Sequence, residues 1–313
     1  MNFPLSSIQA RLDTGRNLVN SEPTINVIIV NWNSAAALRN CLVSIMASDY
    51  PSFRVIVVDN ASSTEDILSL REILQEFHGY PLHMVQSAEN RGYAGGNNTG
   101  LRFIEDNQFD GDIMIVNPDV VVERTTLRVM ASAIIGDVGI VTPRITYPSG
   151  KVLLDRTRLK GYRHQYIVDA PRLPATTDVS QGTCMLIPRA VVDKIGLFDE
   201  RFFLYWEEVD LSIRIKSAGY RLVSVNQTRV TKAHNATARI PPCLYYSVRN
   251  ANLIRKIHPS HFSRGGYFVY LITVTALLVK LIVRPKLLMK AIMSVLCGIW
   301  DGAIGSYGAR KLA

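Results

Sequence analysis

The sequence contains few cysteines, and none of them belongs to a CxxC pair. The four cysteines lie far apart along the chain, at Cys41, Cys184, Cys243 and Cys297. Because a disulfide framework or a structural zinc site needs closely spaced pairs, we expect neither, and the pattern is typical of a protein of the reducing cytosol. Residues 1–17 contain no apolar segment, so we also expect no secretory signal there.

Two common nucleotide-binding motifs are also missing from the sequence. The Gly-rich stretch NRGYAGGNN at residues 90–98 is not GxGxxG, and it is not a P-loop because no Gly-Lys-Ser/Thr follows it. This argues against a nicotinamide-dependent dehydrogenase and against a P-loop NTPase. The stretch lies just before an expected helix, where backbone N–H groups could face a phosphate group. A purely structural turn is the alternative.

Acidic residues are fewer than basic ones, which gives a formal net charge of +9 and an isoelectric point near 9.4. Such a charge favours a polyanionic partner: nucleic acid, an anionic membrane surface or a phosphorylated substrate. A nucleic-acid surface would gather basic and aromatic side chains on one face. The basic residues are instead concentrated at residues 144–172 and in the C-terminal region, so we expect no nucleic-acid partner.

Short apolar runs alternate with helix-like stretches in the first half of the chain. Runs typical of buried strands occupy residues 25–30, 54–58, 81–86, 112–116 and 138–142. Helical patterns occupy residues 34–46, 64–77, 97–107 and 125–135, with Ser34 and Thr64 as expected N-caps. This alternation predicts an α/β fold with a mostly parallel sheet flanked by helices.

We expect the chain to divide into three regions: an N-terminal arm at 1–23, a catalytic domain at 24–241 and a helical region at 242–313. Within the catalytic domain, residues 145–178 lack a clear period and are rich in Arg, Tyr and Pro. We expect them to form a mobile or acceptor-facing loop. Order returns with expected strands at residues 182–187 and 221–225.

The C-terminal region contains two apolar runs, at residues 267–283 and 287–300. Each run is short for a simple membrane span, which needs about 20 apolar residues. Basic residues flank both runs: Arg255, Lys256, Arg264, Arg284, Lys286, Lys290, Arg310 and Lys311. The combination predicts two interfacial or re-entrant helices on an anionic leaflet. The alternative is a pair of helices packed on the catalytic domain.

Polar clusters follow three of the expected strands, at residues 31–33, 59–62 and 117–119. In α/β sheets of this kind, ligands bind beyond the carboxyl ends of the strands. Asp119 is well placed there to hold Mg²⁺ or Mn²⁺ between its carboxylate and a diphosphate, because such cations prefer oxygen ligands. An Asp that follows Pro is also common in turns and helix caps, which is the alternative.

Three carboxylates gather in the segment Trp206-Glu207-Glu208-Val209-Asp210. In a cleft, such crowding raises the pKa of a carboxyl group and suits a general base. At the start of a helix the same acids could instead complement the helix dipole. His234 follows a β-branched stretch and is a candidate metal ligand, although a lone His usually has no such role.

Six segments of the chain together resemble the family 2 glycosyltransferases, and within them the bacterial rhamnosyltransferase-like group. The resemblance covers about residues 24–237. In order, the segments are VIIVNWNS at 27–34, VIVVDNASST at 55–64, NRGYAGGNN at 90–98, IVNPDV at 115–120, GTCMLIPR at 182–189 and GLFDERFFLYWEEVDLSIRIKSAGYRL at 196–222. Any one of them is a weak signal, whereas six in family order are specific.

The resemblance implies a GT-A fold, an inverting sugar transfer and a set of donor-binding residues. Asp59 resembles the residue that binds the donor's base, with Asn31 and Asn33 in the same pocket. Arg91 and Gly92 resemble contacts to the ribose or the diphosphate. The segment 117–119 stands where the family has its DxD metal motif. Because Asn117 replaces the first Asp, Asp119 would carry most of the Mg²⁺ or Mn²⁺ binding, with His234 as a further ligand.

The same resemblance implies that Glu208 is the catalytic base, with Glu207 and Asp210 positioning the acceptor and the base. It suggests dTDP-rhamnose as the donor. The basic, apolar region at residues 242–311 suits a polyprenyl-diphosphate-linked saccharide as the acceptor, at the cytoplasmic face of a bacterial inner membrane. A UDP-hexose donor is the alternative. A nucleotidyltransferase is a second alternative, but it usually carries a Gly-rich loop after the first strand, where residues 31–34 stand here.

Overall fold

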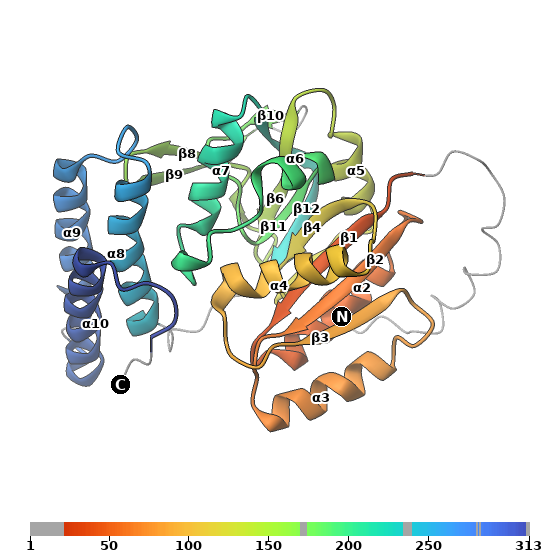
Figure 1. The fold of residues 1–313 in the computed structure, drawn as a ribbon, viewed down its shortest axis with the longest axis horizontal. Coiled ribbons are helices and arrows are strands. Elements are labelled where there is room, and N and C mark those ends of the chain that lie inside the picture. Colours follow the sequence, from red (N-terminus) through yellow and green to blue (C-terminus); the bar gives the residue numbers. More distant parts are fainter. Residues whose placement is uncertain (1–21, 170–173, 234–239, 280, 282, 311–313) are drawn as a thin grey trace.

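The computed structural model describes residues 22–169, 174–233, 240–279, 281 and 283–310. A mixed sheet lies at the centre, with helices on both of its faces and three further helices at one end of the molecule (Figure 1). The strand order in the sheet is β10-β12-β6-β11-β4-β1-β2-β3, and β5 and β7 pair with β12 and β6. Most of the expected N-terminal arm lies outside the described residues.

The first half of the sheet is parallel, as the alternating pattern predicts. It contains β1 (Ile25–Asn31), β2 (Phe53–Asp59), β3 (Leu82–Gln86) and β4 (Asp112–Val116). β1 pairs with β2 and β4, and β2 pairs with β3, all in parallel register. The apolar runs of β1 and β2 are buried because helices cover both faces of these strands.

The second half of the sheet mixes strand directions. β6 (Val138–Thr146) runs parallel to β12 (Arg221–Lys232), whereas β11 (Cys184–Ile187) is antiparallel to both β4 and β6. The short β5 (Val120–Val122) pairs antiparallel with the end of β12. This last pairing brings the chain just after residue 119 beside the end of the last core strand.

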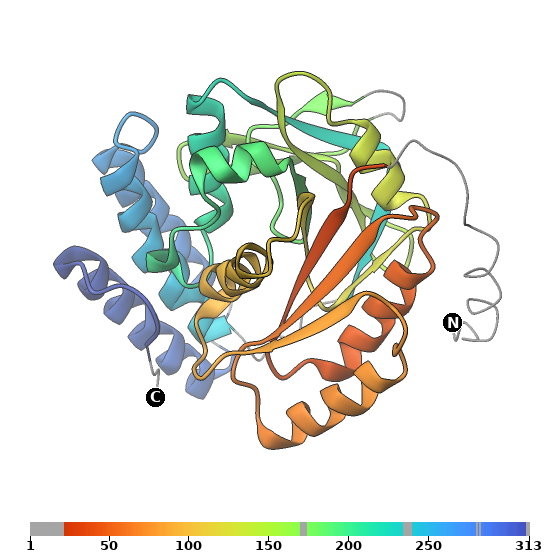
Figure 2. The same ribbon diagram turned by 45° about the vertical axis from the view of Figure 1, so that its right-hand side comes forward.

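Two helical layers cover the sheet (Figure 2). α2 (Ala35–Met46), α3 (Thr64–Gln75) and α5 (Thr126–Ser132) pack on one face. α4 (Gly92–Asp106), α6 (Arg189–Ile195) and α7 (Glu207–Ser217) pack on the other. A 3₁₀ turn, η1 (Glu200–Phe202), leads into α7. Each layer encloses its own apolar core against the sheet.

Two helix starts differ from the sequence expectation. The N-cap of α3 is Ser63 rather than Thr64, because the Ser63 hydroxyl accepts a hydrogen bond from the N–H of Asp66. α4 begins at Gly92 rather than at residue 97, so the Gly-rich stretch forms its first turns. Glycine has a low helix propensity, so the sequence does not indicate a helix here. The glycines let α4 lie close to the sheet, because a Cβ on Gly96 would lie 2.7 Å from Val30.

The expectation of a loop at residues 145–178 was wrong for about half of that range, which forms strands. The range contains β7 (Val152–Leu154), β8 (Arg156–Lys160), β9 (Arg163–Ile167) and β10 (Ala175–Thr176). β8 and β9 form an antiparallel hairpin. The sequence conceals the hairpin because Arg158, Lys160 and Arg163 are exposed on its outer face, so no apolar alternation marks it.

The three helices at the end of the molecule are α8 (Ile240–Ile257), α9 (Arg264–Val279) and α10 (Pro285–Ile304). α10 packs closely on α8, since Cβ atoms on Gly298 and Gly302 would lie 2.7 Å and 3.1 Å from α8 carbonyl oxygens. Among the described residues, α10 is the helix long and apolar enough to cross a membrane by length and composition. One face of α10 nevertheless packs against α8.

Candidate functional site

Asn31 and Asp59 meet at the carboxyl ends of the first two strands. They are register partners in the β1–β2 pair, and both are 0% exposed. The Asn31 amide donates to Asp59 Oδ1 at 3.4 Å and to Asp66 Oδ2 at 2.8 Å. Asp59 Oδ2 is buried and has no hydrogen-bond partner among the described residues. An orphaned carboxylate oxygen suits a ligand that brings its own N–H group.

Two surface hollows flank this pair of strand ends. One of about 420 Å³ lies beyond β2 and β3 and is lined by residues that include Ser62, Gln86 and Ser87. A second of about 610 Å³ lies between α2 and α3 and is lined by residues that include Asn33. Asn33 also accepts a hydrogen bond from the Ser63 N–H at 2.8 Å. Of the two predicted pocket residues, Asn33 lines the second hollow, whereas Asp59 is fully buried and lines neither of these two.

Arg91 and Gly92 contact the protein itself at the start of α4. The Arg91 guanidinium forms an ion pair with Glu200 at 2.7 Å, while the side chain keeps 38% of its surface exposed. Gly92 has a φ of +69°, and a Cβ there would lie 2.2 Å from the carbonyl oxygen of Phe203. Gly92 therefore permits the close approach of the segment that precedes residues 206–210, which we call the acidic motif.

The segment Asn117-Pro118-Asp119 is bonded to two parts of the chain that are distant in sequence, one just before β11 and one just after β12. The Asn117 N–H donates to the Thr183 carbonyl at 3.0 Å, and the Asp119 carbonyl accepts from the Ala233 N–H at 3.1 Å. No described residue donates a hydrogen bond to the Asp119 carboxylate. His234, the expected second metal ligand, directly follows Ala233 and lies outside the described residues.

The oxygen-bearing side chains of Asn117 and Asp119 suit a hard divalent cation. The described part of the chain holds no group of three or more His, Cys, Asp or Glu residues that could enclose a metal ion. A sparse protein shell of this kind fits Mg²⁺ or Mn²⁺, which keep several waters and take substrate phosphate oxygens as further ligands. The arrangement does not resemble a structural metal site.

Glu207 and Glu208 occupy the first turn of α7 inside the protein. Glu207 is 4% exposed, Glu208 is partly buried, and the Oε2 atom of each has no partner among the described residues. Burial raises the pKa of Glu208, and burial together with the neighbouring Glu208 charge raises the pKa of Glu207. Backbone hydrogen bonds and, to a smaller extent, the charge of Lys232 partly offset the rise in the pKa of Glu208. Such a pair holds its protons at higher pH than exposed carboxylates do.

The position of Lys232 connects the acidic pair with the predicted metal segment. Lys232 pairs with Val120 in the β5–β12 ladder, one residue after Asp119. Its charge also acts on Glu208. The structure thus brings Glu208 and Asp119 to the same end of the sheet from segments almost ninety positions apart in the chain.

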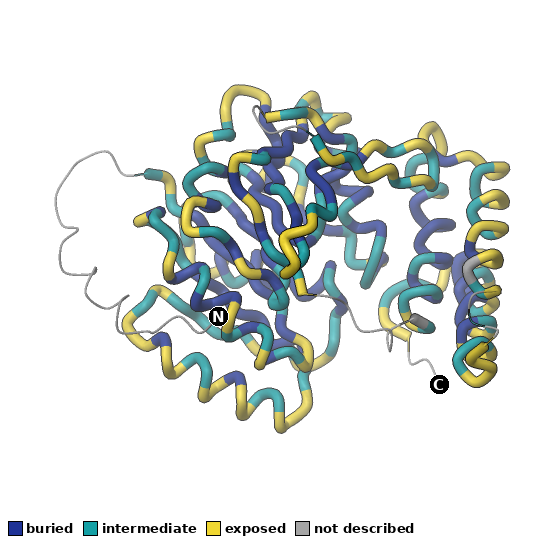
Figure 3. Tube along the Cα trace, turned by 180° about the vertical axis from the view of Figure 1, so that it is seen from behind, coloured by how far each residue is buried: buried dark blue, intermediate teal, exposed yellow. Residues whose placement is uncertain are grey.

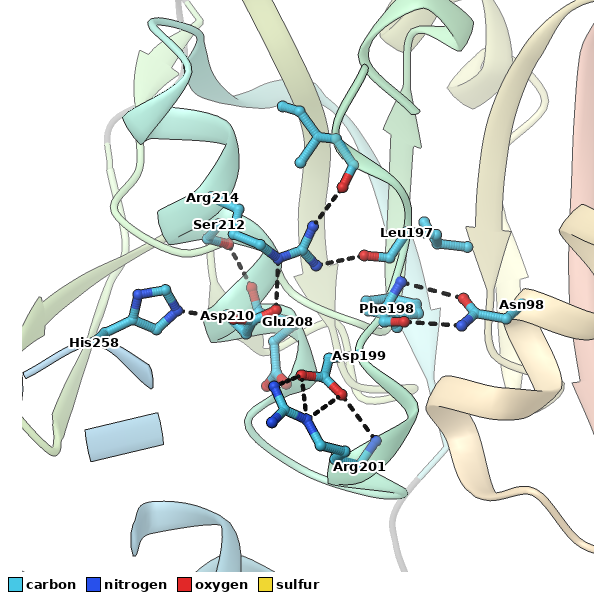
Figure 4. A network of polar contacts seen from close by, with 11 residues as sticks. Asn98, Leu197, Phe198, Asp199, Arg201, Glu208, Asp210, Ser212, Arg214 and His258 are labelled. Carbon is cyan, nitrogen blue, oxygen red and sulfur yellow. Dashed lines mark hydrogen bonds and ion pairs between the residues drawn. The ribbon is translucent and has the colours of Figure 1, made fainter. Parts of the chain in front are cut away.

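Asp210 has a different environment from the two glutamates (Figure 4). Its carboxylate accepts a hydrogen bond from Arg214 at 2.7 Å and contacts Nε2 of His258 at 2.8 Å. Burial alone would raise the pKa of Asp210, but the His258 and Arg214 contacts hold it below its ordinary value. Asp210 is therefore an ionised anchor that joins α7 to the end of α8.

The backbone just before the acidic pair is strained. Phe203, Tyr205 and Trp206 have φ values of 62°, 71° and 75°, a region that non-glycine residues rarely adopt. Each such residue costs on the order of 1–3 kcal/mol and persists where surrounding contacts enforce it. We refer to residues 202–206 as the left-handed loop. Its partners lie on α4 and α8, and sequence reasoning missed those on α8 because that helix was assigned to a separate C-terminal region.

One family model, described as "Glycosyltransferase like family 2", matches residues 23–250. The chain belongs to this family. The match confirms the family expected from the six segments, and it favours glycosyl transfer over the nucleotidyl transfer considered as an alternative. The match also extends into α8, past residue 241, the expected end of the catalytic domain.

Two curated relatives carry the names of sugar transferases. The chain is 29% identical over 220 residues to a low-salt glycan biosynthesis hexosyltransferase of Haloferax volcanii, covering 67% of each chain. It is 25% identical over 245 residues to an N-acetylglucosaminyl-diphospho-decaprenol L-rhamnosyltransferase of Mycobacterium tuberculosis, covering 69% of this chain and 78% of the relative. This glycosyltransferase therefore has both hexosyl- and rhamnosyltransferase relatives.

A solved structure confirms the fold. The mannosyltransferase PcManGT from Pyrobaculum calidifontis, in complex with GDP-Man and Mn²⁺, superposes with a TM-score of 0.56 at 14% identity. The superposition covers 96% of this chain and 94% of that one. The likeness supports the expected GT-A fold. The roles of the individual site residues stay predictions.

Proposed function

We propose that the protein is an inverting rhamnosyltransferase. It would transfer L-rhamnose from dTDP-rhamnose to a polyprenyl-diphosphate-linked saccharide in the synthesis of a cell-surface polysaccharide. The observation that carries the proposal is the pair of buried Glu207 and partly buried Glu208 at the same end of the sheet as Asp119, where the charge of Lys232 acts on Glu208 and the Lys232 backbone pairs with Val120. The name of the mycobacterial relative supports the choice of sugar and of a lipid-linked acceptor.

In the proposed reaction, Glu208 accepts the proton of an acceptor hydroxyl. The oxygen then attacks the anomeric carbon from the face opposite the diphosphate, which inverts the configuration there. Burial makes Glu208 a better base than an exposed carboxylate, and a positioned base contributes ~10²- to 10⁴-fold to such a step. A divalent cation, held by Asp119 and His234 in our assignment, would offset the charge on the departing diphosphate.

The donor would lie along the carboxyl ends of β1, β2 and β4. Asp59 Oδ2 is the free acceptor that a pyrimidine N–H group would fill. The hollow beyond β2 and β3 is lined by Ser62, whose hydroxyl bonds the same Asn31 amide as Asp59 does. Both thymine and uracil carry such an N–H group. The site therefore fits a dTDP-sugar and also the alternative, a UDP-hexose. The name of the relative from Haloferax volcanii supports transfer of a hexose and specifies no nucleotide.

We further propose that the C-terminal helices lie on the cytoplasmic face of a bacterial inner membrane. Figure 3 shows many exposed positions on α9 and α10. Among them are large apolar side chains, which we call the apolar face: Phe268, Val269, Ile272, Val279, Met289, Met293, Leu296, Trp300 and Ile304. α10 packs on α8 through its other side, so an interfacial position fits this arrangement better than a free span.

A donor panel tests the proposed reaction. Purified protein would be incubated with Mg²⁺ or Mn²⁺, a lipid-linked saccharide and dTDP-, UDP- or GDP-sugars, and the release of nucleoside diphosphate would be measured. We expect dTDP-rhamnose to give the highest rate. A higher rate with a UDP-hexose would favour the alternative donor, and release of pyrophosphate would refute glycosyl transfer.

The Glu208→Gln variant tests the assigned base. Because the amide cannot accept the acceptor's proton, we expect turnover to fall by at least ~100-fold while donor binding remains. Turnover would be followed as above, and donor binding by calorimetry. Glu105→Gln, at an exposed position on α4, is the control. Substantial turnover by Glu208→Gln would remove Glu208 from the mechanism.

A further inference from the structure

The left-handed loop before the catalytic glutamates is bound by two neighbouring residues of α8. Arg249 is 1% exposed, and its guanidinium donates to the carbonyl oxygens of Arg201 at 3.1 Å and Phe202 at 2.8 Å. A third donation at 2.5 Å reaches the carbonyl of Gly308, beyond α10. A buried cation solvated largely by backbone carbonyls is unusual, because such a group costs free energy unless it is fully hydrogen-bonded.

Asn250 makes a denser set of contacts with the same loop. It is 0% exposed, and its amide nitrogen lies within hydrogen-bond distance of three carbonyl oxygens: Phe202 at 2.7 Å, Leu204 at 2.8 Å and Tyr205 at 2.8 Å. Its own carbonyl oxygen accepts from Arg249 Nε at 2.9 Å. The two α8 side chains therefore form one connected donor set, which we call the α8 clamp.

The residues on either side of the two glutamates also contact α8 or the residue that follows it. The Trp206 indole donates to the Ser247 carbonyl on α8 at 3.1 Å. The Asp210 carboxylate contacts His258 just beyond the end of α8. Glu207 and Glu208 are thus held between two points that are both attached to the same helix.

The contacts explain how strained backbone persists at this place. The left-handed residues would relax if their carbonyl partners were absent, because their conformation is unfavourable by itself. A buried carbonyl that loses its donor also costs about 1–3 kcal/mol. The donors of the α8 clamp therefore favour the strained path of the loop, and that path determines where α7 begins and where its first carboxylates lie.

We propose that Arg249 and Asn250 are positioning residues for sugar transfer, which hold the left-handed loop so that Glu208 faces the acceptor hydroxyl. The inference rests on the proposed function for the role of Glu208. It assigns to α8 a part in the catalytic unit. Neither residue needs to touch the donor or the acceptor.

Two variants of Asn250 test the positioning role. Asn250→Ala removes the whole donor group, whereas Asn250→Leu keeps the approximate shape of the side chain and removes the amide donors without adding a charge. We expect both to lower kcat by roughly 100-fold, as a small misplacement of a catalytic group does. The KM for the donor should stay unchanged, because the donor site lies at the strand ends. A residue needed only to fill space would tolerate Leu.

Asn252→Ala is the matched control. Asn252 lies two positions further along α8 and is 5% exposed, but it contacts Arg255 and faces Gly302 of α10 instead of the loop. Hydrogen exchange followed by mass spectrometry supplies a second readout that does not need activity. We expect faster exchange at residues 202–208 in both Asn250 variants and unchanged exchange there in Asn252→Ala.

The outcomes separate this inference from the proposed function. Wild-type kcat in the Asn250 variants, or equal exchange changes in Asn250→Ala and Asn252→Ala, would overturn the positioning role. If the wild-type protein transfers no sugar, the proposed function fails. The exchange measurement then still decides whether the α8 clamp holds the loop.

Discussion

Glu207 illustrates a residue whose charge opposes folding. Its carboxylate is buried beside a second carboxylate, and one of its oxygens has no partner among the described residues. Its pKa is raised well above the ordinary value, first by burial and then by Glu208. The folded protein therefore binds a proton more tightly than the unfolded chain does at this position. Stability linked to Glu207 is present at low pH and is lost as the pH rises through the folded-state pKa.

Glu207→Gln should consequently stabilise the protein at neutral pH. The amide carries no charge, so the cost of ionising the buried pair falls, and the gain should disappear near pH 4, where Glu207 is protonated in both states. One kcal/mol corresponds to about 2–4 °C in Tm for a domain of this size. Thermal unfolding at pH 7.5 and pH 4 measures the effect, with Glu105→Gln as the control. An equal Tm shift at both pH values would contradict the assignment.

α4 shows how one helix serves both packing and the site. Its first residue, Gly92, lies against the Phe203 carbonyl, and the N–H of Ala94 donates to that carbonyl at 3.3 Å. Gly96 and Gly100 lie against side chains of β1, and the Asn98 amide bonds the Phe198 carbonyl at 2.8 Å. The Gly-rich stretch thus joins the sheet to the loop that precedes the acidic motif.

Gly92→Ala should impair both stability and turnover. The new Cβ would meet the Phe203 carbonyl at 2.2 Å, so the left-handed loop must move. Gly136→Ala is the control, because Gly136 also has a positive φ of +63° but open space around its Cβ position. We expect Gly136→Ala to cost about 1–2 kcal/mol in urea unfolding and to keep full turnover. Equal kcat in the two variants would show that the Phe203 contact does not matter.

The molecule as a whole has two unlike ends. The catalytic half surrounds the sheet, while α8, α9 and α10 form the opposite end (Figure 1). The two ends are connected: Tyr270 of α9 stacks on Tyr162 of the β8–β9 hairpin, and both rings lie edge-to-face against Trp206. α9 therefore has one face near the acidic motif and another that carries part of the apolar face. A membrane bound there would lie one helix away from the left-handed loop.

Replacing exposed residues of the apolar face should weaken binding to vesicles. In Leu296→Gln/Trp300→Gln, two side chains that are 55% and 65% exposed lose their apolar character. Each buried side chain of this size contributes about 1.5–3 kcal/mol, so the double variant should bind at least ~10-fold more weakly. Co-sedimentation with phosphatidylglycerol-containing vesicles would measure this binding.

The control for the vesicle experiment is Ile135→Gln. Ile135 is 71% exposed but belongs to the catalytic half, in the connection after α5. We expect its variant to bind vesicles as the wild type does. Absence of wild-type binding to anionic vesicles, or equal losses in the two variants, would refute the membrane assignment of α9 and α10.

The sequence pattern was enough to predict those elements in which burial follows a regular spacing along the chain. The buried runs of β1, β2 and β4 and the polar residues at their ends could be predicted, because a parallel strand covered on both faces needs continuous apolar side chains. The raised pKa values of Glu207 and Glu208 could likewise be anticipated from three carboxylates in a short segment. The lowered pKa of Asp210 could not, because it depends on its contacts with His258 and Arg214. The hairpin β8–β9 could not, since its outer face is charged and leaves no alternation.

The tertiary structure alone decided which distant segments share the site. The charge of Lys232 acts on Glu208, Gly92 lies against Phe203, and Asn250 bonds the left-handed loop, and in each case the two partners are far apart in the chain. In the last two, one partner is a backbone carbonyl, which every residue type carries, so the sequence shows no complementary side chain. Periodicity reports which face of an element is buried, but only the packed chain shows what that face meets.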